Sequence, residues 1–126
     1  MSADWQQWLL VAAGGALGGA LRYAISGWVA KHVGETFPWG TLVVNASGAF
    51  LLALLMGSSA FSSSSDGVRL LLGVGVIASY TTVSSLSLQT LSLAREGQLR
   101  AAAAYVGLSV VTGLAAGALG WWLVRL

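Results

Sequence analysis

The sequence has no cysteine, one histidine and one proline among its 126 residues. Without cysteine the chain forms no disulfide and no thiolate metal site, and thiol chemistry is excluded. The single His32 cannot form a cluster of histidine ligands. The sequence also contains no paired nucleophile and base and no phosphate-binding loop, so we do not expect an enzyme.

Charged residues are scarce as well. They make up 8% of the chain, against 56% hydrophobic residues and a mean hydropathy of +0.80, which places the protein in a bilayer. The net charge of +2 gives no reason to expect a nucleic-acid partner. The four carboxylates, Asp4, Glu35, Asp66 and Glu96, fall in predicted loops or at helix ends, so a proton-coupled transporter is disfavoured.

The length predicts an all-α membrane protein with four transmembrane helices in one integral domain, residues 1–126. A helix needs about 20 residues to cross a bilayer, which leaves no room for an extramembrane domain. The spans are expected at about residues 8–28, 40–56, 68–94 and 101–123. The Ser-rich tract 58–67 between the second and third spans is predicted to be a loop.

Four glycines lie in the middle of the first span: Gly14, Gly15, Gly18 and Gly19. They form two overlapping pairs in which the glycines are four residues apart. Such pairs leave a groove that another helix backbone can approach closely, which is how helices associate in lipid. We therefore predict a helix-packing role for these residues.

The orientation of the chain in the membrane is weakly specified. One side carries Lys31, Arg95 and Arg100, and the other carries Arg69 and Arg125. Because the side richer in Lys and Arg normally faces the cytoplasm, this near tie predicts insertion in both directions. A two-fold axis in the membrane plane would then pair two copies as an antiparallel, dual-topology homodimer.

The third span contains an unusually polar run at residues 79–90, in which seven of twelve residues are Ser or Thr. Unpaired polar groups cost several kcal/mol in hydrocarbon, so such a run is expected to face protein or a water-filled path. Gly73, Gly75 and Ala78 are small enough to allow a break in the helix. A broken helix exposes carbonyls for a monovalent cation and N–H groups for an anion.

Two polar residues stand inside the first two spans. Arg22 either forms an anion-attracting vestibule or extends to the headgroups, and both interpretations stay open. Asn45 shares a helical face with Thr41 and Gly48, so this face either lines a path or bonds across helices.

The fourth span carries a polar stripe formed by Tyr105, Ser109 and Thr112 at positions i, i+4 and i+7. These hydroxyls can form a track of donors for an anion. Ser and Thr in membrane helices also bond back to their own i−4 carbonyls, so the stripe does not by itself establish a pathway.

At this point the residues resemble those of the CrcB/Fluc family of small fluoride channels, over essentially the whole chain. Four blocks carry the resemblance: Gly14–Gly18 leading to Arg22-Tyr23, Pro38–Gly48, Thr81–Leu86 and Ala102–Tyr105. The second block, with Trp-Gly-Thr-Leu and Val-Asn, is the most specific of them.

The resemblance implies a passive fluoride exporter of the bacterial inner membrane, with two pores in an antiparallel dimer surrounded by lipid. It also implies a structural sodium ion at the dimer interface, held by the backbone carbonyls of Ala78 and Thr81, and a vestibule at Arg22. The implied pore residues are Asn45, Thr82, Val83, Ser84, Ser85, Leu86, Tyr105, Ser109 and Thr112. Fluoride is small and strongly hydrated, so a narrow track of hydroxyl and amide donors suits it.

The sequence departs from the family pattern in its third span. The family block reads Thr-Thr-Phe-Ser-Thr-Phe, and its two rings offer an anion their positive edges. Val83 and Leu86 stand at those two positions here, and Gln89 stands where an acidic residue is common.

Three explanations remain open for these departures. In the first, the hydroxyls alone suffice to conduct fluoride. In the second, the chain is one subunit of a heterodimer with a homologous partner. In the third, the protein conducts another small ion. A fourth alternative, a non-conducting assembly protein built on the Gly-rich first span, belongs to a different functional class.

Overall fold

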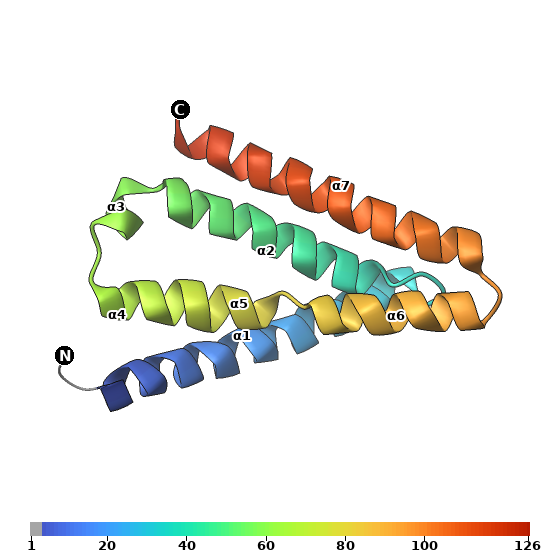
Figure 1. The fold of residues 1–126 in the computed structure, drawn as a ribbon, viewed down its shortest axis with the longest axis horizontal. Coiled ribbons are helices and arrows are strands. Elements are labelled where there is room, and N and C mark those ends of the chain that lie inside the picture. Colours follow the sequence, from blue (N-terminus) through green and yellow to red (C-terminus); the bar gives the residue numbers. More distant parts are fainter. Residues whose placement is uncertain (1–3) are drawn as a thin grey trace.

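The computed structural model describes residues 4–126, which form helices joined by short connections (Figure 1). Four helical segments are long and apolar enough to cross a membrane: α1 (Asp4–Val33), α2 (Trp39–Gly57), the compound segment Asp66–Arg95, and α7 (Leu99–Val124). This confirms the prediction of an all-α chain with four candidate spans. The helices extend past the expected spans by one or more residues, because hydropathy does not register the polar turns at their ends.

The third segment changes its helical form along its length. It begins with α4 (Asp66–Arg69), continues as the π-helix η1 (Leu70–Ile77) and the short α5 (Ala78–Tyr80), and resumes as α6 (Val83–Arg95). The backbone is extended between α5 and α6, with ψ 158° at Thr81 and φ −151°, ψ 121° at Thr82. The Thr82 hydroxyl accepts a hydrogen bond from Ser85 N–H at 3.1 Å, which caps the new helix. Figure 1 shows this interruption as the thin link between α5 and α6.

Helix α1 packs closely on η1 through two of its four central glycines. A Cβ on Gly14 would collide with the carbonyl oxygen of Leu71, and one on Gly18 would collide with that of Val76. A Cβ on Gly15 would lie 3.2 Å from the Ser79 hydroxyl, which is tight but not a collision, while one on Gly19 would have nothing within 4 Å. The close backbone approach therefore depends on Gly14 and Gly18.

Helices α2 and α7 lie side by side along most of their lengths (Figure 1). Gly120 of α7 lies against the Phe50 carbonyl, where a Cβ would come within 2.6 Å of the oxygen. A small core forms where α2, α6 and the start of α7 meet. It consists of Leu42, Leu93, Ala102 and Tyr105.

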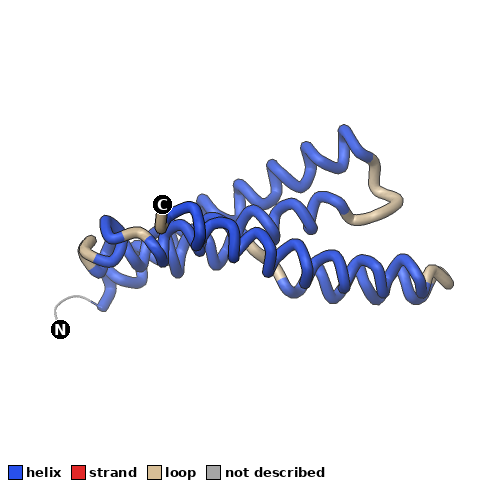
Figure 2. Tube along the Cα trace, turned by 90° about the horizontal axis from the view of Figure 1, so that it is seen from above, coloured by secondary structure: helices blue, strands red, loops and turns tan. Residues whose placement is uncertain are grey.

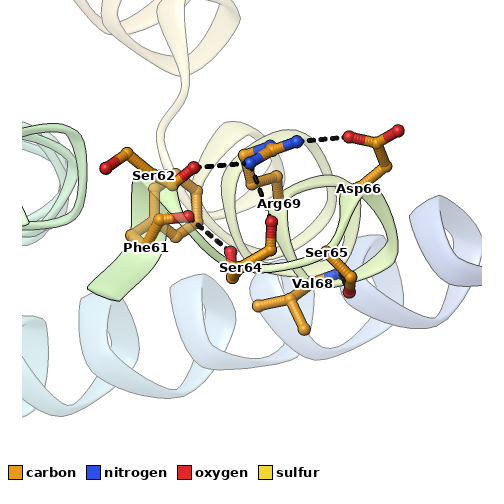
Figure 3. A network of polar contacts seen from close by, with 7 residues as sticks. All are labelled: Phe61, Ser62, Ser64, Ser65, Asp66, Val68 and Arg69. Carbon is orange, nitrogen blue, oxygen red and sulfur yellow. Dashed lines mark hydrogen bonds and ion pairs between the residues drawn. The ribbon is translucent and has the colours of Figure 1, made fainter. Parts of the chain in front are cut away.

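The connection between α2 and α4 is more ordered than the sequence predicts. The prediction of a loop over residues 58–67 is wrong in part, because Ser59–Ser62 form the short helix α3. The Ser58 hydroxyl caps the first turn of this helix. Arg69 then fixes the rest of the connection, as Figure 3 shows: its Nη1 donates to the carbonyls of Ser62 and Ser64, each at 2.8 Å, and its Nη2 pairs with Asp66. Serine hydroxyls that cap short turns account for this local order.

The two hairpins diverge at one end of the molecule. In the view of Figure 2, the α1–α2 connection lies apart from the α6–α7 connection. The space between these hairpins contains the larger of the two cavities described next.

Candidate functional site

The interruption between α5 and α6 is held by the side chain of Asn45 from α2. The Asn45 Nδ2 group donates to the Thr82 carbonyl at 2.9 Å, and Asn45 Oδ1 accepts from Thr82 N–H at 2.7 Å. The bond from Thr82 N–H replaces the helical bond that this group cannot make in an extended backbone, and the bond to the Thr82 carbonyl holds the start of α6. We refer to this pair of bonds as the Asn45 clamp.

The clamp leaves backbone carbonyls free of their usual helical donors. In a continuous helix, the Ala78 carbonyl would accept from Thr82 N–H and the Thr81 carbonyl from Ser85 N–H. Here Thr82 N–H bonds to Asn45, and Ser85 N–H bonds to the Thr82 hydroxyl. Ala78 O retains only a long contact of 3.5 Å from the Thr81 hydroxyl. Carbonyl oxygens freed in this way are suitable ligands for a monovalent cation.

A polar cavity of about 660 Å³ lies between α1, α2 and α6. One face of α6 lines it with Ser85, Gln89, Ser92 and Glu96, at the i, i+4, i+7 and i+11 spacing of a helical stripe. Arg22 of α1 lines the cavity too, is half-buried, and has no ion-pair partner within residues 4–126. The cavity therefore combines one guanidinium, the two carboxylates of Glu35 and Glu96, and hydroxyl and amide donors.

A second, more apolar cavity of about 540 Å³ lies between α2, η1, α6 and α7. Its wall contains Val83 and Leu86, together with Ser109 of α7. Val83 is 75% exposed, so this side of the cavity is open. The Ser109 hydroxyl is buried and, within residues 4–126, is the buried side-chain polar atom that has no hydrogen-bond partner. Thr82 lines both cavities, so the two meet at the interruption.

The structure does not align the predicted stripe on α7 along one cavity. Tyr105 is fully buried, donates from its hydroxyl to Gln89 Oε1 at 2.6 Å, and packs edge-on against Phe37. Ser109 reaches the apolar cavity. Thr112 instead donates back to the Leu108 carbonyl at 2.6 Å, which is the local bond that membrane hydroxyls often make.

The remaining sequence-predicted positions divide between the two cavities. Ser84 and Ser85 line the polar cavity, while Ala78 and Thr81 line the apolar one beside Asn45. The interruption therefore presents hydroxyls to one side and free carbonyls near the other.

Comparison with known proteins assigns this arrangement to a family. Residues 9–121 match the family model described as CrcB-like protein, Camphor Resistance (CrcB). The chain belongs to the CrcB family. Its similarity to this family covers all four candidate spans, so it is a multi-pass membrane protein of a channel family.

Several curated relatives of the CrcB family are similar over nearly their full lengths. A protein of Rhodospirillum rubrum is 50% identical over 123 residues, covering 92% of this chain and 89% of the relative. One from Thermus thermophilus is 45% identical over 118 residues, with coverage of 94% and 93%. One from Anaeromyxobacter dehalogenans is 47% identical over 118 residues, with coverage of 93% and 94%. Each is named fluoride-specific ion channel FluC, which supports a fluoride channel as the family function.

Sequence reasoning missed two partners near the interruption. The Tyr80 hydroxyl, on a buried ring, lies 2.9 Å from the Ser47 hydroxyl of α2, so a second polar contact supports α5 beside the Asn45 clamp. A Cβ on Gly48 would collide with the Thr81 side chain, so α2 also needs a glycine here. The sequence feature that could have indicated these contacts is the run Asn45-Ala46-Ser47-Gly48, in which polar and small residues interrupt an apolar span.

Proposed function

We propose that this protein conducts fluoride passively across the bacterial inner membrane. The observation that carries the proposal is the polar cavity, in which Arg22 and the hydroxyl-bearing stripe of α6 lead to the interruption at Thr82. A strongly hydrated anion loses water only where donors replace it, and this cavity supplies such donors. The name of the FluC relatives supports fluoride as the ion.

The assembly that we propose is an antiparallel, dual-topology homodimer with pores at its interface. One side of the chain carries three Lys or Arg residues and the other carries two, so the orientation in the membrane has little bias. The apolar cavity is open beside Val83, and the buried Ser109 hydroxyl on its wall lacks a partner in one chain. A second copy would close this cavity and supply the missing contacts.

A sodium ion at the centre of that dimer is part of the proposal. The Ala78 and Thr81 carbonyls fit this role, because their usual helical donors are diverted to Asn45 and Thr82. A cation held there would neutralise the partial negative charge of carbonyls brought together from two chains. The chain's own residues, through the Asn45 clamp, keep these carbonyls available.

A second candidate function is favoured by Val83 and Leu86. Aliphatic side chains offer an anion no positive ring edge, and they make the second cavity more apolar than the first. The chain would then be one subunit of a heterodimer whose homologous partner supplies the rings, or a channel of altered selectivity.

The test is ion efflux from liposomes that contain only this purified chain. A fluoride electrode would follow fluoride, and chloride would be followed under the same gradient. Fast efflux that is selective for fluoride supports the proposal. No efflux from the homomer, with activity restored by a homologous subunit, supports the heterodimer. Flux that follows the cation when the cation is exchanged overturns fluoride conduction by either dimer and supports a channel of altered selectivity.

A further inference from the structure

Tyr80 lies in the chain between the two carbonyls that the interruption frees. The carbonyls of Ala78 and Thr81 have both lost their usual helical donors. The Tyr80 ring is buried, and Tyr80 lines neither of the two cavities. Its side chain therefore meets no ion in a cavity, but its backbone links one freed carbonyl to the other.

The Tyr80 side chain is fixed to α2 by a pair of hydroxyls. Its hydroxyl lies 2.9 Å from the hydroxyl of Ser47, which in turn donates to the Val44 carbonyl at 3.1 Å. A serine hydroxyl has one proton to donate, so Tyr80 is the donor in the contact with Ser47. We refer to this contact as the Tyr80–Ser47 brace.

Helix α2 contacts three successive residues at the interruption. The brace fixes Tyr80, and the Asn45 clamp fixes Thr82. Between these two points, the Thr81 side chain lies against Gly48, where a Cβ would collide with the methyl group of the threonine. The backbone is therefore fixed both before and after the Thr81 carbonyl.

The freed carbonyl of Ala78 depends more on the brace than on the clamp. Ala78 is exposed, and its carbonyl retains only the long contact from the Thr81 hydroxyl. Within residues 4–126, the brace is the one side-chain hydrogen bond that reaches α5 (Ala78–Tyr80) from another helix. A carbonyl that moves freely must be ordered when a cation binds, and this ordering lowers the affinity. A braced α5 thus presents its carbonyls at a smaller entropic cost.

We propose that the Tyr80–Ser47 brace sets the affinity of this chain for the sodium ion of the proposed dimer, by holding the Ala78 and Thr81 carbonyls in place. The inference rests on the sodium site under the proposed function and deepens it, because it names residues outside that site which control it. Tyr80 and Ser47 are positioning residues and contact no ion. Loss of the brace should weaken sodium binding without removing a ligand.

The experiment follows thermal unfolding of the detergent-solubilised protein while sodium replaces choline at constant ionic strength. A ligand that binds the folded protein raises its melting temperature once the ligand concentration exceeds the dissociation constant. Tyr80→Phe keeps the ring and removes the hydroxyl, and we expect the sodium dissociation constant to rise about fivefold. Ser47→Ala removes the partner instead and should give a rise of the same size. The double variant should also rise about fivefold, and not about 25-fold, because both changes remove one shared bond.

A potassium titration and a serine control separate positioning from a general loss of stability. Carbonyls that can move should distinguish sodium from potassium less well, so the ratio of the two dissociation constants should approach one in Tyr80→Phe. The matched control for Ser47→Ala is Ser63→Ala. The Ser63 hydroxyl also donates to a nearby backbone carbonyl, that of Ser59 at 2.7 Å, but Ser63 is exposed and lies outside both cavities. Its sodium dissociation constant should equal that of the unmodified chain.

An unchanged sodium dissociation constant in Tyr80→Phe overturns the proposal, even if the melting temperature falls at every sodium concentration. The brace would then stabilise the packing of α5 and nothing more. If Tyr80→Phe does not assemble, Ser47→Ala decides, and an unchanged constant in that variant overturns the proposal as well.

Fluoride efflux from liposomes, measured separately, distinguishes this inference from the proposed conduction. If the unmodified chain passes no fluoride but is stabilised by sodium, weaker sodium binding in the two variants supports the brace while conduction fails. If the unmodified chain passes fluoride but is equally stable in sodium and choline, the brace has no sodium affinity to set. That result overturns the inference and leaves conduction in place.

Discussion

The two cavities differ in what a single chain supplies to them. The polar cavity is lined by Arg22, by the carboxylates Glu35 and Glu96, and by hydroxyl and amide groups, so one chain provides both charges and donors. The apolar cavity contains an asparagine, but both ends of its amide are already bonded to Thr82. Ser109 of α7 also lines this cavity, and its buried hydroxyl has no partner within residues 4–126.

This difference indicates where a second subunit is needed. Moving an ion into an apolar region without replacing its water costs many kcal/mol, so the second cavity as one chain forms it is a barrier. The proposed dimer would remove that barrier by adding polar groups or aromatic edges from the partner. The first cavity needs no such addition, since its donors all come from one chain.

Breaking the Asn45 clamp should produce the largest effect, because the clamp holds Thr82, which lines both cavities. Asn45→Ala leaves the buried Thr82 N–H without a partner, at about 1–3 kcal/mol, and removes one of the bonds to the Thr82 carbonyl. Thr82 then loses its fixed position, and we expect efflux to fall about 100-fold while the protein still assembles. Liposome efflux and size-exclusion chromatography would measure the two quantities.

Asn45→Asp is the graded control for that experiment. It keeps the oxygen that accepts from Thr82 N–H and loses the donor to the Thr82 carbonyl. Its efflux should lie between those of the alanine variant and the unmodified chain. If Asn45→Ala shows the same efflux as the unmodified chain, the clamp has no role in conduction.

Adding rings to the apolar cavity should make it resemble a pathway for anions. We expect the double substitution Val83→Phe and Leu86→Phe to raise fluoride efflux about tenfold, because ring edges are favourable for an anion and aliphatic groups are not. The control is Leu88→Phe, which adds the same kind of ring at an exposed position of α6 outside both cavities. Its fluoride efflux should equal that of the unmodified chain. If the double variant is no faster than Leu88→Phe, the missing rings do not limit this chain.

Sequence patterns could predict the helices but not the division between the two cavities. Four apolar segments of sufficient length indicate the four spans. A polar run that would be unfavourable in lipid indicates that the site lies in the third span. The helical spacing of Tyr105, Ser109 and Thr112 also indicates a shared face. Spacing does not reveal that Tyr105 is buried, that Thr112 bonds to its own helix, and that only Ser109 reaches a cavity.

The same limit applies to the residues that support the interruption. The polarity of Asn45 suggests a partner, but the partner's identity depends on how α2 crosses the third segment. The Tyr80–Ser47 contact and the Tyr105–Gln89 bond are long-range pairs, separated by 33 and 16 residues. No local periodicity contains that information.

The packing of α1 on η1 joins a helix that lines the polar cavity to one that lines the apolar cavity. We expect Gly18→Ala to destabilise the protein by about 1–3 kcal/mol, because its Cβ would overlap the Val76 carbonyl. Gly19→Ala is the matched control, one residue away with open space around it, and its thermal stability should be unchanged or slightly raised. Equal melting temperatures in the two variants would contradict the close contact between α1 and η1.

The smallest effect is expected at Arg69, which lies outside both cavities. Its guanidinium bonds to two carbonyls and pairs with the exposed Asp66, so Arg69→Ala loosens only the connection around α3 (Figure 3). An exposed ion pair contributes about 0–1 kcal/mol, and we expect a loss of about that size in thermal unfolding with normal fluoride efflux. Asp66→Asn, which removes the charge pair and leaves both carbonyl bonds, should lose less. A large fall in efflux in either variant would mean that this connection is coupled to the interruption at Thr82, and the two cavities would then not be the only regions that control flux.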